Sequence, residues 1–210
     1  MARRPSPARR HPRRTESRDA RIDALLGYAE KQIEDIANSY EAQLDEQHVP
    51  VELSIKIKNC CENMRSALDY LAHRIFERTY PGQAPPAILA FPTGGSRKAD
   101  AIDAIKRQFP GLRTVNAALW DGLMRAHPYR RGNGWFRDFL NVVNDNKHWD
   151  LVAQRRREAP FDSPSFKAPV VFRSGDSAVE FRFRGIEANA IFLLEQALTN
   201  IRLLVLDLPY

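Results

Sequence analysis

Apolar residues recur every three or four positions over two long stretches in the first part of the chain. One stretch runs from Asp19 to about His48, and the other from about Val51 to Thr79, with Pro50 between them. Such spacing places apolar side chains along one face of a helix, whereas Pro interrupts a helix because it has no N–H to donate. Two long amphipathic helices joined by a short turn pack antiparallel. The pattern therefore predicts a helical hairpin.

Shorter helical patterns fill the middle of the chain. Ser96 is predicted to cap a helix over residues 97–108, and Thr114 to cap a second helix over 115–126. Pro or Gly follows each of these two segments, as is typical of helix ends. A third helix is predicted from Trp135 to about Arg155.

The spacing changes to strict alternation near the end of the chain. Residues 169–173 and 179–184 are predicted to form two half-buried strands joined by a Ser-Gly-Asp-Ser turn, and an apolar helix follows over 186–206. We therefore expect a mainly α protein whose residues 19–210 form a single domain. That domain is predicted to be an antiparallel helical bundle with a small antiparallel β-hairpin at about 169–184.

The positive charge of the chain is confined to its beginning. The formal net charge is +6, and residues 1–18 account for all of it, with seven Arg against one Glu. This Arg- and Pro-rich tail is expected to be disordered, because it has too few apolar residues to offset the entropy of ordering. It is interpreted as an arm for RNA or DNA phosphates, an unselected solubilising extension, or an organelle transit peptide. The candidate nucleic-acid residues are Arg3, Arg4, Arg9, Arg10, Arg13 and Arg14.

No apolar run reaches the roughly 18 residues of a membrane span, so a cytoplasmic protein with no membrane partner is expected. The two cysteines, Cys60 and Cys61, are adjacent. Two cysteines at neighbouring helical positions are poorly placed to form a disulfide with each other or to bind a metal together. Both cysteines are therefore predicted to be buried and reduced. We expect no metal and no cofactor. The stretch FPTGGS at 91–96 lacks the spacing of a phosphate-binding loop and is predicted to lead into a helix.

Polar residues line one edge of the second predicted helix. Arg65, Asp69 and His73 follow one another at intervals of four and can touch. They could form a polar line at the edge of the bundle groove, where Arg would hold a phosphate. Alternatively, Arg65 and Asp69 form an ordinary surface ion pair.

The helix predicted from Trp135 carries two polar rows. Asn146 and Asp150 fall within its apolar face and require partners, of which Arg65 is a candidate for Asp150. The other row lies on the opposite face and contains Arg137, Asn141, Asn144 and His148. Either one row faces solvent, or the helix is covered on both sides, for example by a second subunit. His148 beside amides and Lys147 could act as a general base.

Four short segments together resemble a family of uncharacterised bacterial proteins. They are NMRSALDYLA at 63–72, FPT at 91–93, HPY at 127–129 and NDNKH at 144–148. The family carries similar segments in the same order, with patterns like HNLRSALDHLA, FPI, QPY and NxDKHR. The resemblance covers roughly residues 50–155, and Glu62, Asn146 and Trp149 stand where the family has His, Asp and Arg. The candidate binding residues on and beside these segments are Asn63, Asp69, His73, Tyr129, Arg130, Asn144 and Asn146.

The long helical hairpin also resembles HEPN-type helical domains. Many of these are metal-independent ribonucleases of toxin and phage-defence systems, and they usually form homodimers. Their motif places His four to six residues after Arg on one helix. Here, seven residues separate Arg65 from His73, and ten separate Arg137 from His148.

Three functional hypotheses follow. The first, which we favour, is a non-catalytic HEPN-like module that binds a nucleic acid or nucleotide with help from the tail. The second is a metal-independent endoribonuclease that uses His148 with Arg65 or Lys147 as catalytic residues. The third is a homodimeric scaffold module without a ligand.

Overall fold

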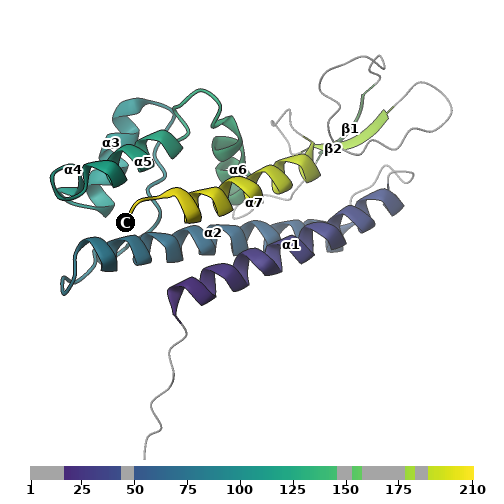
Figure 1. The fold of residues 1–210 in the computed structure, drawn as a ribbon. Helices are drawn as coiled ribbons and strands as arrows, with labels where there is room; N and C mark the ends of the chain where they lie inside the picture. Colours follow the sequence, from purple (N-terminus) through teal and green to yellow (C-terminus); the bar gives the residue numbers. More distant parts are fainter. Residues whose placement is uncertain (1–16, 44–49, 146–152, 158–177, 183–188) are drawn as a thin grey trace, which may run out of the picture.

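The protein is mainly helical, as the sequence pattern predicted. The computed structural model describes residues 17–43, 50–145, 153–157, 178–182 and 189–210. The elements are shown in Figure 1 and are α1 Arg18–Gln43, α2 Val51–Thr79, α3 Lys98–Gln108, α4 Leu112–Val115, α5 Ala117–Ala126, α6 Gly134–Asp145, β1 Ala153–Arg157, β2 Ala178–Arg182 and α7 Ala190–Asp207.

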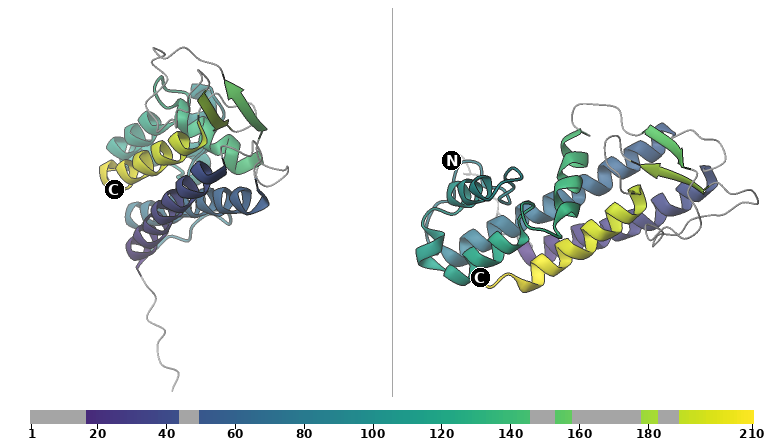
Figure 2. Two further views of the ribbon diagram at one scale, coloured as in Figure 1. Left: turned by 90° about the vertical axis from the view of Figure 1, so that its right-hand side faces the viewer. Right: turned by 90° about the horizontal axis from the view of Figure 1, so that it is seen from above.

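Helices α1 and α2 form an antiparallel pair, and α7 lies alongside both (Figures 1 and 2). The predicted apolar stripes face each other, since Ile22 and Ile36 of α1 and Ile57 of α2 are almost completely buried. The thiol of Cys60 donates to the carbonyl of Ala29 across this interface at 3.7 Å. The two cysteines are buried and free, and burial raises the pKa of the Cys60 thiol to about 12.

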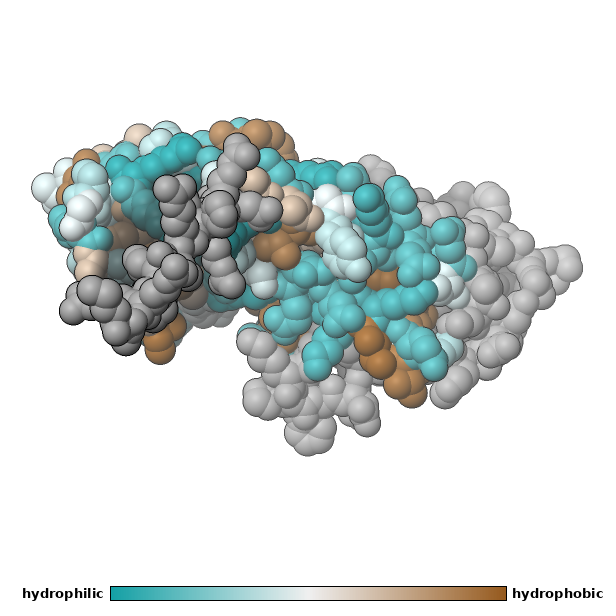
Figure 3. Space-filling model, turned by 90° about the horizontal axis from the view of Figure 1, so that it is seen from below, coloured by the Kyte–Doolittle hydropathy of each residue, from teal (hydrophilic) through white to brown (hydrophobic). Residues whose placement is uncertain are grey.

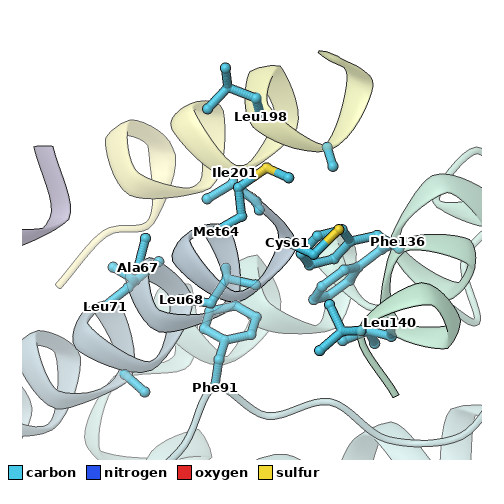
Figure 4. Packing of buried hydrophobic residues seen from close by; sticks show 14 of the residues in the cluster. Cys61, Met64, Ala67, Leu68, Leu71, Phe91, Phe136, Leu140, Leu198 and Ile201 are labelled. Atoms are coloured by element: carbon cyan, nitrogen blue, oxygen red, sulfur yellow. The ribbon is translucent and has the colours of Figure 1, made fainter. Parts of the chain in front are cut away.

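Helix α6 crosses the bundle and completes its core. Figure 4 shows Phe136 and Leu140 of α6 beside Cys61 and Leu68 of α2, with Phe91 from the loop before α3 on the same side. Leu198 and Ile201 of α7 close the cluster near Met64. Helices α3, α4 and α5 form a separate group toward the C-terminal end of α2. The core therefore fixes where the loop at 91–96 lies relative to α6.

Several predicted boundaries were wrong. The helix predicted to run to about Arg155 is described as α6 up to Asp145, and residues 153–157, at its predicted end, form β1 instead. Strand β2 spans 178–182, within one residue of the start predicted for 179–184, and pairs antiparallel with β1. Its predicted partner, 169–173, lies outside the described residues.

Two predicted helix caps were also wrong. Thr114 lies within α4, and the cap of α5 is Asn116, whose side-chain oxygen accepts from the Leu119 N–H at 2.9 Å. Arg97, not Ser96, precedes α3, because the Asp100 carboxylate reaches back to the Arg97 N–H at 3.2 Å. Asp at the third helical position satisfies a free N–H at the helix start.

A group of basic residues packs where α1 begins and α2 ends. We call Arg18, Arg21, Arg74 and Arg78 the paired arginine cluster. Arg18 binds Glu77 at 2.6 Å, Arg21 donates to the Tyr70 hydroxyl at 3.2 Å, and Arg74 and Arg78 both bind Asp19. Arg74 is only 8% exposed and also donates to the Val205 carbonyl at 2.9 Å. The cluster thus joins α1, α2 and α7.

Within the described residues, no helix is long and apolar enough to cross a membrane. The face that carries α1 is largely hydrophilic, and its visible hydrophobic atoms form small separate patches (Figure 3).

Candidate functional site

The loop at 91–96 contacts two of the segments that carry the family resemblance, 63–72 and 127–129. The Phe91 N–H donates to the Asp69 carboxylate at 3.0 Å, and the other oxygen of Asp69 accepts from Arg65 Nε at 3.4 Å. The Phe91 ring contacts the Phe136 ring of α6 edge-on, with centroids 6.1 Å apart. The predicted Arg65–Asp69 pair therefore exists, and it supports the start of the loop.

His127 ties the same loop to the turn after α5. The Gly94 N–H donates to His127 Nε2 at 3.0 Å, and the histidine is 2% exposed. Burial lowers the pKa of His127 to about 4, against the opposing effect of Asp100. The ring is therefore neutral at neutral pH and acts as an acceptor at Nε2, which suits a structural role better than proton transfer.

The two glycines of the loop lie against α3. A Cβ at Gly94 would come within 2.5 Å of the Asp100 carbonyl oxygen and 3.0 Å of His127 Nε2, and one at Gly95 within 2.4 Å of the Asp100 carboxylate. Glycine is therefore required by close approach. Because the Gly94 N–H is already bonded to His127, it does not face a ligand.

A pocket of about 360 Å³ opens between this loop and α6, and we call it the polar pocket. Thr93 and Ser96 line it from the loop, and Pro128 and Leu140 contribute apolar walls. Arg137, Asn141 and Asn144, the polar row predicted for one face of this helix, complete it. The same helix buries Phe136, Phe139 and Val143 on its other face.

A second pocket, of about 430 Å³, is lined by four basic side chains, and we call it the basic pocket. Its cations are Lys98, Arg113, Arg125 and Arg130, and its one acidic side chain is Asp121. None of the four cations forms an ion pair with another described residue. Trp120 and Tyr129 supply aromatic walls, and the Arg130 guanidinium lies 6.0 Å from the Tyr129 ring centre.

The two pockets adjoin. Residues 93–96 line the polar pocket, and Lys98, two positions further, lines the basic pocket. Likewise, Pro128 belongs to the polar pocket, whereas Tyr129 and Arg130 belong to the basic pocket. The loop before α3 and the turn after α5 therefore separate one pocket from the other.

The predicted site residues divide between these pockets and other places. Tyr129 and Arg130 line the basic pocket and Asn144 the polar pocket. Asn63 does not join them, since its amide donates to Gln32 of α1 at 2.8 Å. His73 lies near Arg18 instead, and burial together with that charge lowers its pKa. Asn146, Lys147, His148 and Asp150 lie outside the described residues, as do Arg3, Arg4, Arg9, Arg10, Arg13 and Arg14.

Sequence reasoning missed most of the basic pocket. Lys98, Arg113 and Arg125 lie on three different helices, and no spacing in the sequence connects them. The only signal was the HPYRR run at 127–131, which places an aromatic ring beside two cations. In the part of the chain that the structure describes, no group of His, Cys, Asp or Glu side chains could hold a metal ion.

Compared with known proteins, the chain matches no family model, no curated protein and no solved structure.

Proposed function

We propose that this protein is a HEPN-like helical bundle that binds a nucleotide or a nucleic acid through the basic pocket, without catalysing a reaction on it. The observation that carries the proposal is the grouping of Lys98, Arg113, Arg125 and Arg130, free of ion pairs with described residues, around one hollow.

The charge of the pocket supports a phosphate ligand. Beyond residue 18, basic and acidic side chains are equal in number, so four cations against Asp121 are a local excess. Arg and Lys are the usual partners of phosphate oxygens, and Arg can bind two of them at once. A cation without a carboxylate partner can neutralise a phosphate, which releases a counterion condensed on the nucleic acid.

The walls of the pocket support a ligand with an aromatic base. Tyr129 is half-buried and offers part of its ring beside the cations, whereas Trp120, 8% exposed, presents only a small part of its ring. Stacking of bases on aromatic rings is the usual complement to phosphate binding. The volume of about 430 Å³ is in the range of small-ligand pockets. A pocket of this size suits one nucleotide.

The test is binding of a fluorescent eight-nucleotide RNA or DNA, measured by anisotropy. Arg113→Ala with Arg125→Ala should weaken binding about tenfold or more, since a hydrogen bond to a charged group contributes about 1.5–3 kcal/mol. The matched control removes two exposed cations from outside the pocket, Lys106→Ala with Arg107→Ala, and should bind like wild type. Equal loss in both double variants would contradict a specific role of the pocket.

The tail is proposed to add non-specific attraction for phosphates through its six arginines at positions 3–14. Its deletion should stop at residue 16, because Arg18 is held by Glu77 at the start of α1. Unchanged affinity after that deletion would exclude the tail from binding.

The ribonuclease alternative depends on His148 and Lys147, which lie outside the described residues, and stays a prediction. Its remaining residue, Arg65, already binds Asp69, which supports a structural role for Arg65. RNA left intact by the purified protein in EDTA, or unchanged cleavage by His148→Ala, would exclude this activity.

A further inference from the structure

The polar pocket differs from the basic pocket in what it offers a ligand. Its hydrogen-bonding groups are the carboxamides of Asn141 and Asn144 and the hydroxyls of Thr93 and Ser96. Its one cation, Arg137, is bound to Asp138 at 3.1 Å. The Gly94 N–H is taken by His127. The polar pocket thus has many donors and acceptors but little free positive charge, so it is suited to a neutral polar group rather than to a phosphate.

Carboxamides suit the edge of a nucleobase. An Asn side chain presents one acceptor and two donors, and it can pair with a base through two hydrogen bonds at once, as it does with adenine. Asn141 and Asn144 lie one helical turn apart on the exposed side of α6. They can therefore act on one ligand together. Pro128 and Leu140 provide apolar walls for its ring faces.

Two short segments line both pockets: residues 93–98, which are the loop and the first residue of α3, and the turn at 128–130. We propose that the polar pocket holds the base of the nucleotide next to the one bound in the basic pocket. The ligand is then a single-stranded nucleic acid of at least two nucleotides, and Asn141 and Asn144 select its base. This inference rests on the proposed function of the basic pocket.

Duplex nucleic acid does not fit this arrangement. The base edges that the asparagines would bind are paired inside a duplex, whereas single strands expose them and can splay successive bases into separate pockets. The border between the pockets is also fixed, because Gly94 is locked by Asp100 and His127. Neighbouring bases would thus be held apart.

The test compares mononucleotides, the sixteen dinucleotides as RNA and as DNA, and an eight-base-pair duplex by calorimetric titration. Wild type should bind the best dinucleotide at least tenfold more tightly than either of its mononucleotides, and more tightly than the duplex. Asn141→Ala with Asn144→Ala should weaken that dinucleotide about tenfold to a hundredfold, the discrimination that a bidentate pairing of a side chain with a base provides. It should also reduce the differences between bases and leave mononucleotide affinity unchanged.

The matched control is Asn38→Ala with Asn59→Ala, which removes two exposed asparagines from α1 and α2, and it should bind like wild type. If the Asn141 and Asn144 variant keeps full dinucleotide affinity while Arg113→Ala with Arg125→Ala loses it, the base subsite is wrong and the basic pocket stands. Wild type that binds neither mononucleotides nor single strands would overturn the proposed function itself.

Discussion

The paired arginine cluster and the basic pocket contain the same kind of side chain in opposite situations. In the cluster, the guanidinium groups are bound to Asp19, Glu77, the Tyr70 hydroxyl or a backbone carbonyl. The rings of Tyr70 and Tyr210 lie beside them. In the pocket, no described carboxylate pairs with any of the four cations.

This difference separates a structural from a binding role. A cation with protein partners joins the elements that supply them, and its removal leaves those partners unpaired. A cation without such partners contributes little to folding and is available to a ligand. The number of arginines does not distinguish the paired arginine cluster from the basic pocket. The presence or absence of hydrogen-bonding and ion-pair partners for each arginine does.

Among changes measured at neutral pH, the largest effect is expected for Arg74→Met, which keeps the length of the side chain but removes its charge. Asp19 and the Val205 carbonyl lose their donor, so the free energy of unfolding should fall by about 2–3 kcal/mol. The matched change Arg125→Met in the basic pocket should stay within about 0.5 kcal/mol of wild type. Urea unfolding measures both, and equal losses would remove the distinction between the regions.

A somewhat smaller effect is expected for the loop that forms the border of the pockets. Gly94→Ala should destabilise the protein by about 1–3 kcal/mol, because the added methyl group overlaps the Asp100 carbonyl. Gly27→Ala in α1, where no atom lies within 4 Å of the added Cβ, should stabilise it by about 0.5–1 kcal/mol. Thermal unfolding measures whether each substitution lowers or raises the stability. A Gly94→Ala protein as stable as wild type would mean that Gly94 is not held closely against Asp100.

The third effect is a dependence on pH through His127. Its pKa is lowered by burial to about 4 from the ordinary 6.5, so protonation favours the unfolded chain. Stability should be constant above pH 6.5, fall by at most about 1.4 kcal/mol per pH unit as the pH drops toward 4, and level off below that. His127→Gln keeps an acceptor for Gly94 but does not titrate. The difference between the two unfolding curves isolates His127, and parallel curves would contradict its burial in the neutral form.

The sequence predicted the parts of the site that depend on one element. Helical spacing identified the Arg65–Asp69 pair and placed Arg137, Asn141 and Asn144 in one row, because both depend only on the 3.6-residue repeat. The α1–α2 pair was also predictable, since Pro50 interrupts two long apolar stripes.

The basic pocket could not be predicted in this way. Lys98 starts α3, Arg113 belongs to α4 and Arg125 to α5, so their proximity depends on how three short helices pack. Strand β1 at 153–157 was missed, because the predicted helix was extended to about Arg155. The spacing of residues along the sequence predicts which side chains share one face of a helix. A pocket between helices can be predicted only when the packing of those helices is known.

The most direct measurement of the central claim is the salt dependence of single-strand binding. For each phosphate that the protein no longer neutralises, the slope of the logarithm of affinity against the logarithm of salt concentration should decrease by about 0.7. Arg113→Ala with Arg125→Ala is therefore expected to show a slope shallower by about 1.4 than wild type, while Arg74→Met keeps the wild-type slope wherever it is folded. Parallel lines for wild type and the Arg113 and Arg125 double variant would contradict phosphate binding in the basic pocket.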